Sequence, residues 1–233
     1  PKCQTVLANE QVINGCCWRH EDTNVEIKHL EQWFFRITDY SEELLNGLDK
    51  VDWPERAKKL QRNWIGKSYG TEIDFLINGK KWKIFTTRSD TIFGVTFMII
   101  SAQHTRLMEI VTKDKIRDVE KFLKKLKSVS EKELDEMQKE GVFTGSYAIN
   151  PLTQEEIPVY AGNFVLADYG SGMVMAVPGH DQRDFEFAKK YKLLIKEVVK
   201  GGNIKERAYT DSGILVNSGQ FNNLQSEKAK EEI

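Results

Sequence analysis

The sequence predicts an α/β protein with a small β-barrel core that is decorated with helices. Two observations carry this expectation. From residue 64 onward, short strand-like runs alternate with turns, as in a closed or nearly closed sheet. Between those runs, the lysine- and glutamate-rich stretch 115–140 carries apolar residues at helical spacing, which predicts one helix there and a second that begins near Ser130.

The composition limits which classes of protein the chain can belong to. The chain has 233 residues, of which 40% are hydrophobic, and that is enough to bury a real core. Its formal charge of −1 excludes a chain-wide positive field, so any nucleic-acid binding must use local patches. No apolar run reaches the roughly 20 residues of a membrane span, and the first residues lack signal-peptide features. We therefore expect a cytoplasmic protein without membrane contact.

The chain divides by composition into a partial zinc-knuckle-like segment over 1–24, a helical connective segment over 25–63 and a main domain over 64–233. Cys3, Cys17 and His20 form half of a metal motif, whereas a closed zinc site needs four ligands. Free or buried thiols are the preferred interpretation, and zinc binding is the alternative.

The connective segment carries two helical patterns. Apolar residues from Leu30 to Leu48 recur at helical spacing, which predicts one amphipathic helix or a broken pair. Pro54 suits the first turn of a second helix. The basic face of that helix either meets phosphate or is simply solvated, and we favour solvation. Its charges are Arg56, Lys58, Lys59 and Arg62.

The main domain begins with two predicted strands, 71–77 and 81–87, that flank an Asn-Gly hairpin signal. After a loop at 88–91, the run 92–100 predicts another strand. Further strands are predicted at 145–149, 156–162, 164–168 and 172–178, followed by a helix from about His180 to Lys192. Short strands and glycine-containing turns fill the last third of the chain.

One polar cluster lies where that helix begins. Asp181 is the predicted N-cap, and Asp184 shares a helix face with Phe187, Ala188 and Tyr191, so its carboxylate must point inward or into a cleft. A helix N-terminus favours the ionised carboxylate, which would suit a substrate ammonium. A capping role satisfied by main-chain N–H groups is an equally good interpretation.

The other polar cluster, 86–91, offers four hydroxyls in six residues at the end of a predicted strand. Threonines favour strands by β-propensity alone, which is the structural alternative. Because no conventional nucleophile accompanies the cluster, we expect water to be the attacking group in any reaction at this site.

These two clusters resemble a known family. The stretches "FTTRSDTIFG" (85–94) and "GSGMVMAVPGHDQRDFEFAKKY" (170–191) closely resemble the threonine-rich and aspartate motifs in the editing domain of bacterial-type leucyl-tRNA synthetases. The segments "CCWRHEDT", "LEQWFFRIT", "WPERAKKLQRNWIGKS" and "GILVNSGQFNNLQSEKAKE" resemble that family's connective segments, so the resemblance covers nearly the whole chain. Valyl and isoleucyl editing domains typically lack "MAVPGHDQRD".

The resemblance implies post-transfer editing, the hydrolysis of the ester in tRNA(Leu) mischarged with isoleucine, norvaline or methionine. It implies that Asp184 binds the α-ammonium, with Asp181 beside it at the mouth of the site. Thr86 and Thr87 would contact the ester region and hold the hydrolytic water. Thr91 would narrow the side-chain pocket so that a leucyl group is excluded.

The remaining implied site residues surround these. Met175, Val177 and His180 would line the same pocket, and Tyr169 would contact the terminal adenosine. Arg88, like Arg183, would either shape the site or form a structural ion pair.

By the same resemblance, the partners are the 3′ end of tRNA(Leu) and the remainder of the synthetase. Editing would need no metal or cofactor, whereas ATP, leucine and zinc would serve the complete enzyme only. The chain departs from the family in two ways: Ser89 stands where proline is usual, and the HIGH and KMSKS signatures of aminoacylation are absent. We therefore expect an excised insertion domain or a fragment of a split enzyme, without aminoacylation activity. A non-catalytic tRNA-docking module and a general small-ester hydrolase are the alternative functions.

Overall fold

The computed structural model describes residues 2, 4–26, 28, 31, 33–126, 138–167 and 170–233. The chain divides into two compact units, one formed by 1–27 with 70–233 and the other by 28–69. Within the described residues, no helix is long and apolar enough to cross a membrane. The three domain boundaries expected from the sequence stay predictions.

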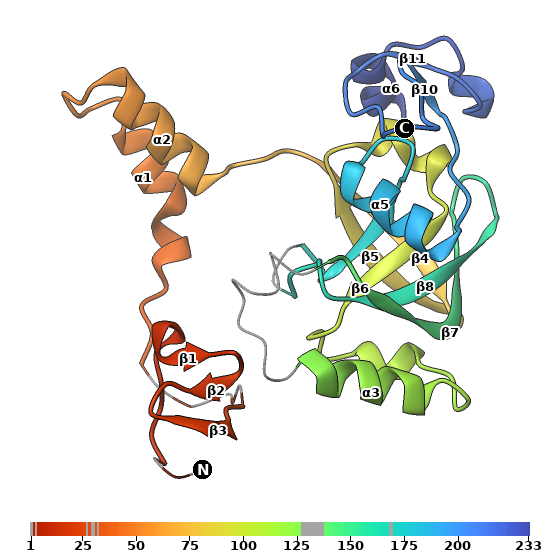
Figure 1. The fold of residues 1–233 in the computed structure, drawn as a ribbon. Coiled ribbons are helices and arrows are strands. Elements are labelled where there is room, and N and C mark those ends of the chain that lie inside the picture. Colours follow the sequence, from red (N-terminus) through yellow and green to blue (C-terminus); the bar gives the residue numbers. More distant parts are fainter. Residues whose placement is uncertain are drawn as a thin grey trace. The chain divides into compact units, whose positions relative to one another are not determined.

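The strands and helices carry the labels of Figure 1. The strands are β1 (Val12–Ile13), β2 (Cys16–Cys17), β3 (His20–Asn24), β4 (Thr71–Ile77), β5 (Lys80–Thr86), β6 (Phe97–Ser101), β7 (Gly141–Ile149), β8 (Glu156–Gly162), β9 (Met173–Ala176), β10 (Val199–Lys200) and β11 (Ile214–Leu215). The α-helices are α1 (Ser41–Gly47), α2 (Glu55–Ile65), α3 (Ile116–Leu126), α5 (Gln182–Tyr191) and α6 (Ser226–Glu232). Short 3-10 helices lie at Asn9–Gln11, Ile37–Tyr40, Ser89–Gly94, Leu107–Ile110 and Gly219–Phe221.

A six-stranded sheet in the order β5-β4-β7-β8-β6-β9 forms the centre of the main domain (Figure 1). Its pairs are antiparallel except for β6 with β8, which run parallel. The outer strands β5 and β9 contact each other, but no hydrogen-bonded ladder joins them in the part of the chain that is described. The mixed α/β class is therefore confirmed, whereas a closed barrel is not.

The β4–β5 hairpin follows the sequence prediction closely. Asn78 and Gly79 both have positive φ, 51° and 75°, which is the conformation that a tight two-residue hairpin turn needs. The strands alternate buried with exposed positions, so Phe75 and Ile77 of β4 and Ile84 of β5 enter the core.

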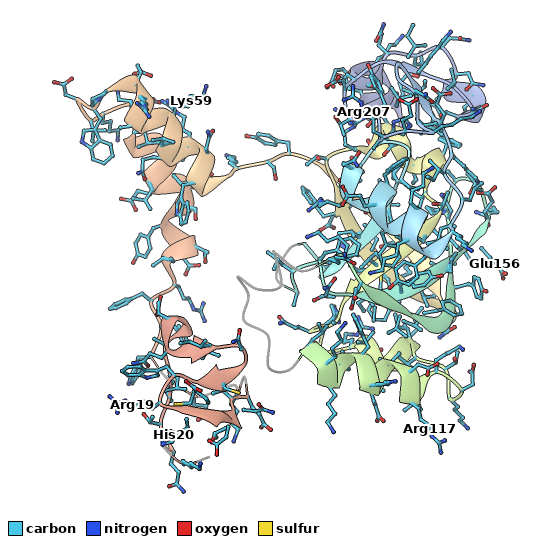
Figure 2. All side chains as sticks on the ribbon, in the orientation of Figure 1. Arg19, His20, Lys59, Arg117, Glu156 and Arg207 are labelled. Carbon is cyan, nitrogen blue, oxygen red and sulfur yellow. The ribbon has the colours of Figure 1, made fainter. Side chains whose placement is uncertain are left out.

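The sheet buries both of its faces. The larger core lies on one face and includes Ile77, Ile100 and Val159, with Val119 of α3 packed against it. On the other face, Phe187 and Ala188 of α5 pack against a smaller cluster from β6 and β9. Charged side chains labelled in Figure 2, such as those on α3 and at the start of β8, project outward from these layers. Helix α5 is therefore fixed to the sheet by its apolar face.

The last part of the main domain forms a small lobe of β10, β11 and α6. Its buried residues are Val199, Leu215, Phe221 and Ala229, and Phe93 packs against them from the 3-10 helix 89–94. This contact joins the lobe to the segment that contains the threonine-rich cluster.

Several expected elements differ from the structure. The predicted strand 92–100 begins only at Phe97, because residues 89–94 form a 3-10 helix that contains the buried Asp90. Residues 164–167 of the predicted strand 164–168 form no strand: 164 and 165 are in a bend, 166 is irregular and 167 is in a turn. The predicted helix over 115–140 covers Ile116–Leu126, and the second helix near Ser130 lies outside the described residues.

In the unit 28–69, the described residues form helix only in the second half of the range from Leu30 to Leu48 that was predicted to be helical. A 3-10 helix, Ile37–Tyr40, leads into α1, and Leu48, which follows α1, is buried. Helix α2 follows Pro54, which is its N-cap rather than part of its first turn. Gly66 ends α2 in the left-handed conformation, with φ of 65°. On the basic face, Lys58 lies 3.6 Å from Glu55, and phosphate binding stays untested.

The N-terminal sheet β1-β2-β3 brings Cys17 opposite His20. Cys17 is buried, and Cys3 lies outside the described residues. Among the residues whose placement is described, no three His, Cys, Asp or Glu side chains gather as a metal site would require. The zinc-knuckle-like character of 1–24 therefore stays a prediction.

Candidate functional site

A pocket of about 350 Å³ lies where the end of β5, the 3-10 helix 89–94, β9 and the start of α5 meet. Both polar clusters of the sequence line it. From the first come Thr86, Thr87, Arg88 and Thr91, and from the second come Met175, Val177, His180, Asp181 and Asp184. Of the predicted site residues, Tyr169 lies outside the described part of the chain.

One side of the pocket is formed by Thr86, Thr87 and Thr91, and we call it the hydroxyl wall. Local hydrogen bonds fix two of its three threonines. Thr86 Oγ1 accepts from the main-chain N–H of Arg88 at 3.0 Å, which turns the chain away from β5. Thr91 is buried, and its hydroxyl donates to the carbonyl of Arg88 at 2.9 Å. Thr87 is exposed between them. In this wall, the hydroxyls of Thr86 and Thr91 are fixed by hydrogen bonds within the turn, and the side chain of Thr87 is exposed.

Arg88 forms the structural ion pair that was one of its two expected roles. Its Nε and Nη2 lie 2.9 Å and 3.1 Å from the two carboxylate oxygens of Asp90, which is fully buried. Its Nη1 donates to the carbonyl of Thr210 at 3.0 Å. Such a bidentate pair restrains the loop that lacks the family's proline at Ser89.

The opposite wall is built on the N-terminus of α5. Asp181 is the N-cap as predicted, and its Oδ1 accepts from the N–H groups of Arg183 and Asp184 at 2.8 Å and 3.3 Å. Asp184 is 7% exposed and shares its helix face with the fully buried Phe187 and Ala188. Its Oδ2 accepts from Val177 N–H at 2.8 Å. The inward orientation expected for Asp184 is therefore confirmed.

The structure corrects the charge state that we expected for Asp184. Burial and, to a lesser extent, the negative charge of Asp181 raise the pKa of its carboxyl to about 8, although the bond from Val177 N–H and the charge of Arg183 act in the opposite direction. The helix N-terminus was expected to favour the ionised form. Its N–H groups are instead capped by Asp181, so desolvation dominates and the carboxyl is mainly protonated at pH 7.

His180 lines the pocket, but its ring is engaged by the main chain. Nε2 accepts from the N–H groups of Val198 and Val199 at 3.0 Å and 3.1 Å, and Nδ1 lies 2.9 Å from the carbonyl of Tyr209. Because Nε2 is an acceptor, the proton of the neutral ring is on Nδ1. Burial lowers the pKa of His180, which is consistent with the neutral form.

Sequence reasoning missed part of the pocket. Phe164, Val165 and Leu166 line it from the segment that was predicted to be a strand. Phe164 also packs against Phe187 of α5, with ring centroids 5.4 Å apart. Because Leu166 is a large apolar residue in a strand-like run, the sequence did not indicate that its side chain is exposed. Together with Met175 and Val177, these residues give the pocket an apolar section beside its hydroxyls and carboxyl.

Three comparisons show what the chain resembles. A family model described as the editing domain of leucyl-tRNA synthetase matches residues 62–233. The leucine–tRNA ligase of Fervidobacterium nodosum is 55% identical over 242 residues, which cover 100% of this chain and 29% of that protein. The leucine–tRNA ligase of Geotalea uraniireducens is 53% identical over 244 residues, with 100% and 30% covered. The chain thus spans less than a third of the length of these relatives.

A solved structure gives the same result. In the crystal structure of a ternary LeuRS-tRNA-LeuAMS complex from Agrobacterium radiobacter, a chain matches with a TM-score of 0.65 and 37% sequence identity. The match covers 87% of this chain and 26% of that chain.

Proposed function

The chain belongs to the family of leucyl-tRNA synthetase editing domains, and from that premise we propose that its pocket hydrolyses the ester bond of mischarged tRNA(Leu). The proposed substrates carry isoleucine, norvaline or methionine, and leucyl-tRNA(Leu) is excluded. One observation supports this proposal above the others: hydroxyls of β5 and its following turn line the same pocket as the buried Asp184.

The proposed reaction uses water as the nucleophile. The water oxygen attacks the ester carbonyl carbon, the bond from that carbon to the ribose oxygen breaks, and the ribose oxygen takes the proton that the water loses. Thr86 and Thr87 orient the water and the ester, since positioning alone contributes substantially to such a step. Hydroxyl and main-chain N–H groups stabilise the developing oxyanion.

Asp184 holds the α-ammonium of the amino acid in this proposal. The carboxyl is mainly protonated in the empty pocket because burial raises its pKa to about 8. An entering ammonium favours the ionised form, so the carboxyl releases its proton as the substrate binds. The pair then forms in a site with little water, where its attraction is strong.

Thr91 supplies the discrimination. Leucine and its competitors differ by the placement of a methyl group, which a single binding pocket distinguishes by only about 1–3 kcal/mol. A second pocket that rejects the cognate side chain solves this problem. Thr91 is buried and fixed to Arg88 O, so it is a rigid block.

The proposal extends to partners, location and architecture. The chain acts on the 3′ end of tRNA(Leu), with Tyr169 at the terminal adenosine, together with the remainder of a leucyl-tRNA synthetase in the cytoplasm. Editing proceeds without metal or cofactor, and ATP, leucine and zinc serve the complete enzyme. The six-stranded sheet, whose outer strands β5 and β9 contact each other, is in this proposal a small barrel without a closing ladder of hydrogen bonds.

The test is hydrolysis of isoleucyl-tRNA(Leu) and leucyl-tRNA(Leu) by the chain and three variants. We expect release of isoleucine only, its loss in Asp184→Asn, and extension to leucine in Thr91→Ala. Glu186→Gln is the matched control, because it makes the same carboxyl-to-amide replacement on the exposed side of α5. Binding of tRNA without hydrolysis would instead favour a docking module, and equal turnover of simple amino-acid esters would favour a general esterase.

A further inference from the structure

The turn between β9 and α5 places both carboxylates of the pocket. It begins at Val177, whose N–H donates to Asp184, and it ends at the N-cap Asp181. Two internal bonds to the carbonyl of Val177 close it, from His180 N at 2.8 Å and from Asp181 N at 2.9 Å. Any movement of this turn therefore moves the carboxyl groups relative to the hydroxyl wall.

The turn is held from outside by segments later in the chain. Tyr209 N–H donates to the carbonyl of Gly179 at 2.9 Å, and Ala208 N–H donates to Gln182 Oε1 at 3.1 Å. The carbonyl of Lys196 approaches so closely that a Cβ at Gly179 would lie 2.2 Å from it. The β10–β11 lobe and the segment 208–210 thus bound the turn on its outer side.

His180 is the side chain that joins these parts. Its ring bonds to three main-chain groups on two segments, the N–H groups of Val198 and Val199 and the carbonyl of Tyr209. His180 is 5% exposed, so water does not replace these bonds if they are lost. Both ring nitrogens are occupied, and neither is available to a substrate.

The same segment also reaches the opposite wall. Arg88, which follows Thr86 and Thr87, donates to the carbonyl of Thr210 at 3.0 Å. Residues 209 and 210 therefore connect to both walls, to one through His180 and to the other through Arg88. We name residues 208–210 the strap.

We propose that His180 is a positioning residue for ester hydrolysis: its neutral ring, protonated on Nδ1, fixes the β9–α5 turn to β10 and the strap. In this way it sets the distance between Asp184 and the threonines. It acts through main-chain groups, and neither ring nitrogen bonds to the substrate. This inference rests on the proposed function for its catalytic readout but not for its structural readout.

The experiment compares His180→Ala, His180→Gln and His180→Asn in the whole chain. The amide oxygen of glutamine reaches about the place of Nε2 and keeps an acceptor for Val198 and Val199, whereas asparagine keeps a donor near Nδ1. A misplacement of about 1 Å can cost on the order of 100-fold in rate. We expect kcat for isoleucyl-tRNA(Leu) to fall at least about tenfold in the alanine variant, with partial rescue by glutamine. KM should change less than kcat, because both ring nitrogens are engaged by main-chain groups rather than by the substrate.

The structural readout is hydrogen exchange at the amide of Val177, which donates to Asp184. We expect faster exchange there in His180→Ala and recovery in His180→Gln. Tyr209→Phe is the matched control, because it removes only the hydroxyl bond to Ser212 and keeps the main-chain bonds of Tyr209. It should match the original chain in both readouts.

The experiment distinguishes a failure of the positioning role from a failure of the proposed function. If the original chain hydrolyses isoleucyl-tRNA(Leu) and a folded His180→Ala variant has the same kcat, the positioning role is wrong and the function stands. If the original chain does not hydrolyse the substrate, the function fails, and the exchange rate of the Val177 amide still decides whether His180 holds the turn. An unchanged rate in the alanine variant overturns the inference, and so does a ring that nuclear magnetic resonance finds protonated on Nε2.

Discussion

Replacing Asp184 by asparagine should stabilise the chain, and the gain should depend on pH. Asp184 is 7% exposed, and its pKa is raised, mainly by burial, to about 8 from an ordinary value of 3.8. The folded state therefore holds a proton that the unfolded chain gives up readily. Asparagine keeps an oxygen that can accept from Val177 N–H but has no ionised form to lose on folding.

The magnitude follows from the two pKa values. Because the folded-state pKa of Asp184 is raised, its contribution to stability is complete below pH 4 and is lost as pH rises through about 8. Each pH unit in that window costs about 1.4 kcal/mol of unfolding free energy. The sum at pH 7 is about 4 kcal/mol, and entry of water into the pocket reduces it, so we expect 2 to 4 kcal/mol.

Urea unfolding followed by circular dichroism at about pH 5, pH 7 and pH 8 measures this difference. The advantage of Asp184→Asn over the original chain should grow with pH, while Glu186→Gln, on the exposed side of α5, should show no such growth. A constant difference between the two chains across that range would refute the assignment of a protonated carboxyl to the folded pocket.

Three further substitutions test the framework around the pocket by the same unfolding measurement. Tyr191→Phe should cost about 1–3 kcal/mol, because the hydroxyl bonds both N–H and carbonyl of Gly141, at 3.0 Å and 2.9 Å; an unchanged midpoint would contradict those bonds. Arg88→Met should cost about 3–5 kcal/mol by leaving the buried Asp90 unpaired, and adding Asp90→Asn should restore much of it; no restoration would contradict the ion pair. Gly79→Ala should cost about 1–2 kcal/mol through its φ of 75° alone, since no atom lies within 4 Å of the added Cβ; a neutral effect would contradict the turn conformation.

Local features of the main domain could be predicted from the sequence. Asn78 and Gly79 predicted the β4–β5 hairpin, because few other residues tolerate positive φ at both turn positions. Asp181 predicted the start of α5, and the spacing from Asp184 to Phe187 predicted that this carboxyl faces inward. These features depend on interactions within a few residues, so their signals are local too. The motif resemblance added the family, which the comparisons confirmed.

Tertiary structure decided the rest, since it depends on groups that are far apart in the chain. The segment 164–166 lines the pocket as a loop, although its composition is typical of a strand. Residues 92–94 belong to a 3-10 helix whose first turn contains the buried Asp90, which is paired with Arg88. The sequence predicted the position of Asp184, but its protonation follows from desolvation, which no local pattern records. Likewise, the motif that contains His180 determined where its ring lies along the chain, and only folding brought Val198, Val199 and Tyr209 to its two nitrogens.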